Sequence, residues 1–217
     1  MPFAVRHRND PIPSIPPLAG WSLHLITDAQ RLADLQQRDA SAMTARLDAG
    51  HRAYVAMIDG VAAAWGWVAT ELATIGELGF TFGIAPRERY LWNFVTLPAF
   101  RGRGIYPRLL NAIVEAESVD TDRFWIAYAP ENHASGSGIR KAGFVDLAAL
   151  SFRDDGQPAL ADVLPGGARI AARVLGIATS GETLAPCWRC VRAGRRHSCA
   201  AGHCACDYQQ PQSGCAA

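Results

Sequence analysis

The sequence contains no cysteine before residue 187, a single lysine, and no apolar run long enough to cross a bilayer. A transmembrane helix needs about 20 consecutive apolar residues, whereas the longest apolar stretch here runs only from Val61 to Val68. Residues 1–17 are charged and rich in proline, so they lack the apolar core of a signal peptide. These absences predict a cytoplasmic protein with no membrane partner.

An excess of charge of either sign is also absent. The 217 residues include 21 basic and 20 acidic side chains, which gives a formal net charge of +1. Nucleic-acid binding generally requires a basic surface, so a nucleic-acid partner is not expected. Hydrophobic residues make up 49% of the chain, and this share is typical of a folded protein with a substantial core.

The cysteines that are present lie within the last 31 residues, which indicates a separate Cys-rich tail over 179–217. In a reducing compartment, such a cluster favours metal binding over disulfides. The candidate zinc ligands are Cys187, Cys190, Cys199, Cys204 and Cys206. The first two have the spacing of a zinc knuckle, but no second Cys-x-x-Cys pair follows. A structural zinc and a metal-free, disordered or redox-active tail both remain open as interpretations.

Hydrophobic periodicity predicts one α/β domain over 21–178, with a mixed central sheet, after an extended proline-rich lead-in over 1–20. The expected strands cover 21–26, 52–58, 61–70, 78–84, 90–96, 124–128, 144–153 and 169–177. The expected helices are one or two between 27 and 50, one over 105–117 and a short one over 135–142. Asp59 and Gly60 predict a tight hairpin turn, and Gly143 predicts a left-handed cap after the last helix.

The stretch Pro98–Pro107 carries the clearest functional signal. It follows an apolar strand, contains Arg101, Arg103 and two glycines, and leads directly into a helix. Glycines let backbone N–H groups approach a ligand closely, while a helix N-terminus and arginines attract phosphate. A dinucleotide-binding fingerprint would need glycine at Pro107, and an NTP-binding loop would need Gly-Lys-Ser/Thr. Because both are missing, a different diphosphate ligand is indicated.

This stretch resembles the acetyl-CoA motif of the GNAT superfamily of N-acetyltransferases, Arg/Gln-x-x-Gly-x-Gly/Ala. The matching positions are Arg101, Gly104 and Tyr106, of which Tyr106 departs from the usual small residue. A later segment resembles the family's Asn-x-x-Ser/Ala motif, followed by a short helix that ends in Lys-x-Gly-Phe; it runs from Asn132 to Phe144. The two motifs occur in the family's order, and the resemblance covers roughly residues 20–177.

The resemblance implies the GNAT fold, a mixed sheet flanked by helices whose fourth and fifth strands splay apart. Those strands correspond to 90–96 and 124–128 here, and the pantetheine arm of acetyl-CoA would enter between them. A backbone N–H in the fourth strand would then polarise the thioester carbonyl. The residues implied in acetyl-CoA binding are Phe94, Val95, Thr96, Arg101, Gly102, Arg103, Gly104, Ile105, Tyr106, Asn132 and Ser135.

The catalytic groups are less well defined, because the tyrosine that usually protonates the leaving thiolate is replaced by Ile139. Tyr128 is a candidate replacement acid, unless the thiolate leaves without help. Tyr90 and Glu88 lie near the place where some relatives carry a general base. Each of the three has a structural alternative as a core aromatic or a surface acid. The same holds for the strand tryptophans, which form either core or a substrate wall: Trp65, Trp67, Trp92 and Trp125.

Three functions follow from these patterns. The first is N-acetyl transfer from acetyl-CoA to an amine of a small molecule or protein. The second is a non-catalytic acetyl-CoA sensor with the Cys-rich tail as its interaction module. In the third, the tail itself carries the main function. The sequence does not identify the acceptor amine, and a homodimer is left open.

Overall fold

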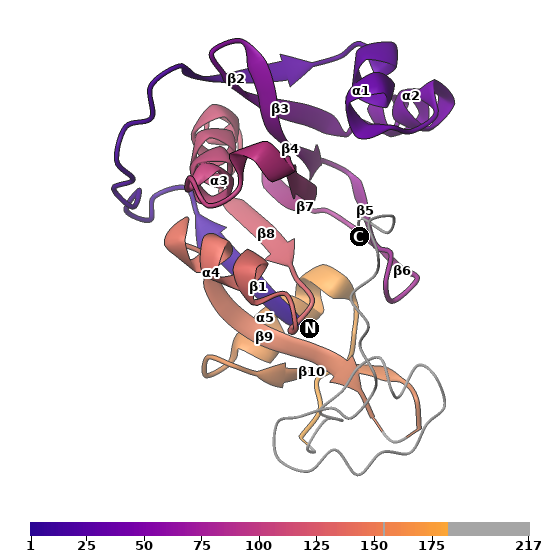
Figure 1. Ribbon diagram of the computed structural model, residues 1–217. Helices are drawn as coiled ribbons and strands as arrows, with labels where there is room; N and C mark the ends of the chain where they lie inside the picture. The colour runs from indigo at the N-terminus through magenta and orange to yellow at the C-terminus, as the bar shows by residue number, and fades with distance from the viewer. Residues whose placement is uncertain (154, 182–217) are drawn as a thin grey trace.

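The computed structural model describes residues 1–153 and 155–181. Its framework is an eight-stranded mixed sheet in the order β10-β9-β1-β8-β7-β4-β3-β2, shown in Figure 1. Neighbouring strands are antiparallel except β7 and β8, which are parallel. The strands of this sheet are β1 (Pro2–His7), β2 (Trp21–Ile26), β3 (Arg52–Ile58), β4 (Val61–Ala69), β7 (Glu88–Thr96), β8 (Arg123–Ala127), β9 (Val145–Phe152) and β10 (Pro158–Asp162). Strands β5 (Leu72–Ile75) and β6 (Phe80–Gly83) form a separate hairpin.

Helices cover both faces of the sheet. They are α1 (Ala29–Gln36), α2 (Ala40–Asp48), α3 (Ile105–Glu117), α4 (His133–Lys141) and α5 (Gly167–Leu175), with a 3₁₀ turn η1 (Pro98–Phe100) before α3. One apolar cluster joins α3 and α4 to residues such as Leu91 and Phe124. On the opposite face, Trp65 and Trp67 pack with α1 and α2, and Trp125 belongs to the cluster that includes α5 and the β5–β6 hairpin. Figure 1 shows α3 and α4 in front of the sheet and α5 behind it.

Most of the predicted elements are confirmed. The expected strand over 21–26 and the expected helix over 105–117 have the bounds that the sequence indicated. Asp59 and Gly60 both have positive φ, at 50° and 78°, as a primed hairpin turn requires. Gly143 has φ 81° after α4, which confirms the left-handed cap. No helix within 1–153 and 155–181 is long and apolar enough to cross a membrane.

The prediction that residues 1–20 lie outside the domain is wrong for the first seven residues. Pro2–His7 form β1, which lies between β8 and β9 inside the sheet, as Figure 1 shows. Phe3 and Ala4 are fully buried, and Phe3 stacks on the Trp125 ring at 5.1 Å between centroids. Six residues that include Arg and His give too weak an apolar signal to predict a central strand.

The predicted strand over 169–177 is also wrong, because this segment is the helix α5. Gly166 and Gly176 flank it with φ of 75° and 66°, and Asp162 accepts hydrogen bonds from the amides of Gly166 and Ala168 at its start. Ala168, Ala171 and Leu175 lie on one face and are buried. The β-branched and arginine residues between these apolar residues made the segment resemble a strand.

Strand β10 was not predicted, and the expected strand over 78–84 is the shorter β6.

Candidate active site

The parallel strands β7 and β8 separate halfway along β7. They pair only where Glu88–Leu91 lie opposite Arg123–Ile126, and β8 ends at Ala127. Beyond Leu91, β7 continues to Thr96 with β4 as its neighbour. The splay expected between the fourth and fifth strands of the family fold is therefore confirmed, and it opens a gap in the sheet beside Trp92–Thr96.

A β-bulge lies at the start of this gap. Trp65 of β4 is opposite Val95, whereas Trp67 is opposite Trp92, so β7 carries one extra residue in this interval. Asn93 occupies it with φ 52°, in the left-handed region that few residues other than glycine adopt. A bulge bends a strand and interrupts its ladder, and here it does so where β7 leaves β8.

Backbone polar groups of β7 point into the gap. The Leu97 N–H donates to the Ala63 carbonyl of the β4 side at 2.9 Å. Because the polar groups of successive strand residues point in opposite directions, those of Phe94 and Thr96 face the gap. Val95, opposite Trp65, directs its groups to β4. Of the three strand residues predicted to meet the pantetheine, Phe94 and Thr96 therefore direct backbone groups to the gap, where the Thr96 carbonyl already accepts a hydrogen bond from Arg101.

The glycine loop lies at the mouth of the gap. Arg101, Gly102, Arg103 and Gly104 are all exposed, and the Arg101 side chain donates from Nε to the Thr96 carbonyl at 3.1 Å. Gly102 and Gly104 have φ of 77° and 68°, and a Cβ built on either would meet nothing within 4 Å.

The Arg101 amide of this loop donates to the Pro98 carbonyl at 3.3 Å, whereas the three amides that follow it differ. In the described part of the chain, no backbone hydrogen bond outside the helices and strands uses the amides of residues 102–104. No side chain caps the N-terminus of α3 either. Free amides, a helix N-terminus and two arginines together form a site for a diphosphate.

The comparisons with known proteins agree with this geometry. The sequence model of the "Acetyltransferase (GNAT) family" matches residues 21–144, which is more than half of the chain. The protein belongs to the GNAT acetyltransferase family. No curated protein matches it.

Solved structures of GNAT proteins are similar to this chain at low sequence identity. A GCN5-related N-acetyltransferase from Kribbella flavida is 19% identical over 67% of this chain and 53% of its own, with a TM-score of 0.47. A GNAT-family protein from Novosphingobium aromaticivorans is 20% identical over 66% and 59%, with a TM-score of 0.45. The aminoglycoside N-acetyltransferase AAC(6')-Iy, solved with CoA, is 20% identical over 64% and 97%, with a TM-score of 0.48. The chain thus spans between half and three fifths of the first two proteins.

Tyr106, which replaces the usual small residue of the GNAT motif, directs its side chain away from the loop. Its hydroxyl lies 3.3 Å from Ser135 Oγ on α4, and its ring is 5.5 Å from that of Phe94. Gly138 provides the space, because a Cβ there would lie 2.4 Å from the Tyr106 ring. Burial raises the pKa of Tyr106 well above its ordinary value. The bulk of this residue is therefore accommodated by α4, and the loop amides stay accessible.

The second GNAT motif forms the start of α4. Asn132 Oδ1 accepts a hydrogen bond from the Ser135 N–H at 3.0 Å, which caps the helix. Asn132 is exposed and Ser135 is half-buried. Both predicted cofactor contacts therefore also have a structural role at the N-terminus of α4.

Tyr128 directly follows β8, and its side chain reaches towards β9 and α4. Its hydroxyl donates to Asp146 at 2.9 Å and accepts from Arg140 at 2.9 Å. Burial, followed by the hydrogen bond to Asp146, raises the pKa of Tyr128 to about 12. The phenol is therefore neutral at ordinary pH and holds a proton.

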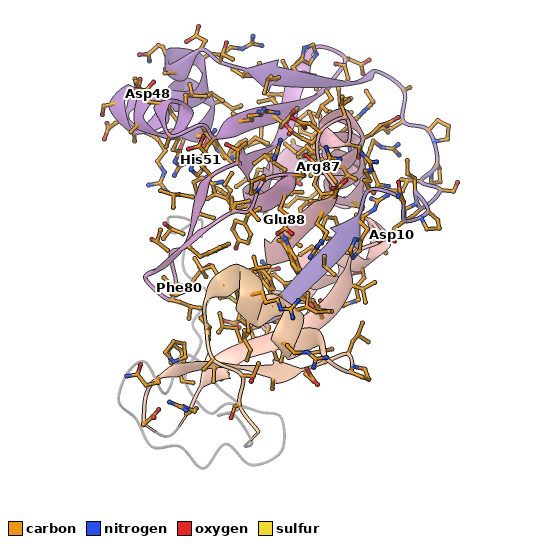
Figure 2. All side chains as sticks on the ribbon, turned by 180° about the vertical axis from the view of Figure 1, so that it is seen from behind. Asp10, Asp48, His51, Phe80, Arg87 and Glu88 are labelled. Atoms are coloured by element: carbon orange, nitrogen blue, oxygen red, sulfur yellow. The ribbon has the colours of Figure 1, made fainter. Side chains whose placement is uncertain are left out.

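Tyr90 and Glu88 lie on the paired half of β7. Tyr90 is 4% exposed, with Phe82 in edge contact at 5.2 Å. Glu88 accepts a hydrogen bond from the Trp125 indole at 2.8 Å and lines a cavity of about 500 Å³ next to α5. Figure 2 shows Glu88 above α5. Glu88 is the first residue of β7, eight residues before Thr96, so it lies far from the phosphate loop. The Tyr90 hydroxyl, in contrast, lies against the backbone of Ala127, the last residue of β8.

The predicted zinc ligands lie outside the described residues. Within the described part of the chain, no group of three or more His, Cys, Asp or Glu side chains could hold a metal ion. Sequence reasoning missed a different group, in which Arg46 and His51 meet Trp67 and Trp92. These residues are too far apart in the chain to form a motif.

Proposed function

We propose that this GNAT protein transfers the acetyl group of acetyl-CoA to an amine by direct attack. The observation that carries the proposal is that the open glycine loop lies next to the gap in the sheet. The loop amides and Arg103 hold the diphosphate, while Arg101 lies at the mouth of the gap. The backbone groups of Phe94 and the Thr96 N–H are offered to the pantetheine arm, as an added strand would require.

The chemistry of the transfer then takes place beside the bulge. A backbone N–H on the gap side of β7 stabilises the negative charge that develops on the thioester oxygen as the neutral amine attacks. The bond from carbon to nitrogen forms, the attacking nitrogen loses one proton to solvent, and the bond from carbon to sulfur breaks. The departing CoA thiolate takes up one proton. Of the three predicted catalytic residues, we propose Tyr128 as the acid, because it directly follows β8 and is less deeply buried than Tyr90. The described residues lend no support to the alternative of a non-catalytic sensor.

The test of the binding site is the substitution Gly104→Asp. It places a carboxylate beside the phosphate position, so the thermal shift produced by acetyl-CoA and the release of free thiol with amines should both be lost. Gly60→Asp is the matched control, because Gly60 also has positive φ and open space around it but lies in a distant hairpin turn. Both variants lose a similar amount of stability, on the order of 1 kcal/mol, and only the control keeps the shift. An unchanged shift in Gly104→Asp contradicts the proposal.

A further inference from the structure

A polar and aromatic cluster lies between α2 and the start of the gap; we call it the Arg46 cluster and define it as Gln36, Arg46, His51, Trp67 and Trp92. The Arg46 guanidinium lies over both indoles, at 4.8 Å from the Trp92 ring and 5.2 Å from the Trp67 ring. His51 meets the Trp92 ring edge-on at 5.2 Å. Trp67 Nε1 donates to Gln36 Oε1 at 3.2 Å.

The cluster contains buried nitrogen atoms without hydrogen-bond partners. They are Gln36 Nε2, Arg46 Nη1, His51 Nδ1 and Trp92 Nε1. Each such group destabilises the protein when it stays unsatisfied, because it has lost its hydrogen bonds to water and gained none in return. Native proteins rarely leave several together, so a concentration of them in one place indicates a missing partner.

That partner must be an acceptor of hydrogen bonds. Arginine and tryptophan side chains can only donate, and no acidic side chain within 1–153 or 155–181 forms an ion pair with Arg46. Burial, together with the nearby charge of Arg38, lowers the pKa of Arg46. Burial and then Arg46 lower the pKa of His51, so its imidazole is neutral. The cluster is therefore cationic and lacks a counter-ion.

The cluster faces the gap from the side opposite to the phosphate loop. Trp92 is the first β7 residue beyond the pairing with β8, and it packs with the apolar cluster of α1 and α2. Leu91 and Phe94 pack instead with the cluster of α3, whose N-terminus carries the loop. Figure 2, seen from the side of α5, shows His51 beside the end of α2. An acceptor that meets a thioester held from the loop side would enter past this cluster.

We propose that the Arg46 cluster binds the carboxylate of the acceptor, so that the substrates are amines that also carry a carboxylate, such as amino acids. This inference rests on the proposed acetyl transfer. A carboxylate can accept bonds from the guanidinium, the Trp92 indole and the Gln36 amide, whose unpartnered nitrogens belong to this cluster. The half-buried Trp92 ring favours an apolar body next to the carboxylate. Polycationic amines are repelled by Arg46 and Arg38.

The decisive comparison uses acceptors that differ in one charge. Free α-amino acids, β-alanine and γ-aminobutyrate are assayed against the corresponding amides, by thiol release with acetyl-CoA and by calorimetric binding to the CoA-bound wild-type protein. We expect at least one free acid to have a KM or Kd tenfold or more below that of its amide. Equal values for acids and amides throughout, or binding of none of the acids, overturn the inference. Failure of acetyl-CoA itself to bind would instead contradict the proposed function.

The variant Arg46→Met keeps the apolar stem and removes the charge. For an acid acceptor, we expect KM or Kd to rise about 10- to 100-fold, while the value for its amide and the KM for acetyl-CoA stay within twofold. Arg31→Met is the matched control, since Arg31 is exposed on α1, and it should leave all values unchanged. A loss that is equal for acid and amide in Arg46→Met assigns Arg46 a structural role only and contradicts the inference.

Discussion

At the scale of single residues, the carboxylate of Glu117 at the end of α3 is held by three side chains. Its side chain is fully buried, and it accepts from Arg52 at 2.8 Å, Arg89 at 3.1 Å and the Tyr54 hydroxyl at 2.5 Å. Burial, then Glu117, raises the pKa of Tyr54 above its ordinary value. This network joins α3 to β3 and β7, and so fixes the helix whose other end carries the phosphate loop.

Replacement of Glu117 by glutamine should destabilise the protein strongly. The amide keeps the shape but removes the buried charge that pairs with Arg89, which is only 8% exposed and keeps a second ion pair with the more exposed Asp120. Breaking such a buried pair costs about 3–5 kcal/mol. Urea unfolding measures the loss. The control is Asp122→Asn, because Asp122 pairs with Arg87 and Arg8 at the surface, where ion pairs contribute little. Equal losses in the two variants would show that burial of Glu117 has no energetic role.

At the scale of elements, prediction from sequence succeeded where local signals agree. The helix α3 combines an apolar stripe, a first-turn proline and a preceding glycine, and its bounds were predicted without error. The loop before it was predicted for the same reason, since its glycines and arginines are contiguous in the chain. The strand β1 and the Arg46 cluster depend on contacts between residues that are distant in sequence, and no local pattern indicates such contacts.

The strand β1 makes a prediction at this scale. Ala4 is fully buried and lies opposite Ile126 on one side and Asp146 on the other. Ala4→Asp would bury a charge without a cationic partner, so we expect loss of the cooperative unfolding transition, measured by circular dichroism. Ile12→Asp, at a position 59% exposed in the same N-terminal segment, should leave the transition unchanged. A folded Ala4→Asp protein with the wild-type midpoint would show that β1 is not part of the stable sheet.

At the scale of the whole molecule, the two faces of the sheet have separate tasks under the proposed function. The face of α3 and α4 presents phosphate-binding amides, and the face of α1 and α2 presents the Arg46 cluster. The gap after Leu91 is the passage between them. The buried tyrosines lie around this passage and within the core, so their ionisation links the stability of the entire domain to pH.

The free energy of unfolding should therefore fall at alkaline pH. Burial is the largest cause that raises the pKa of Tyr54, Tyr90, Tyr106 and Tyr128, the last to about 12. An unfolded tyrosine ionises near pH 10, so the unfolded state loses its phenol protons at a lower pH than the folded state. The free energy of unfolding is therefore undiminished below about pH 10 and declines as the pH rises towards about 12. Urea unfolding between about pH 8 and pH 11 measures the slope. Tyr128→Phe should reduce the slope of the unfolding free energy against pH, because one of the four tyrosines with a raised pKa is gone. A free energy of unfolding that is constant to pH 11 would mean that these phenols ionise as freely in the folded protein as in the unfolded chain.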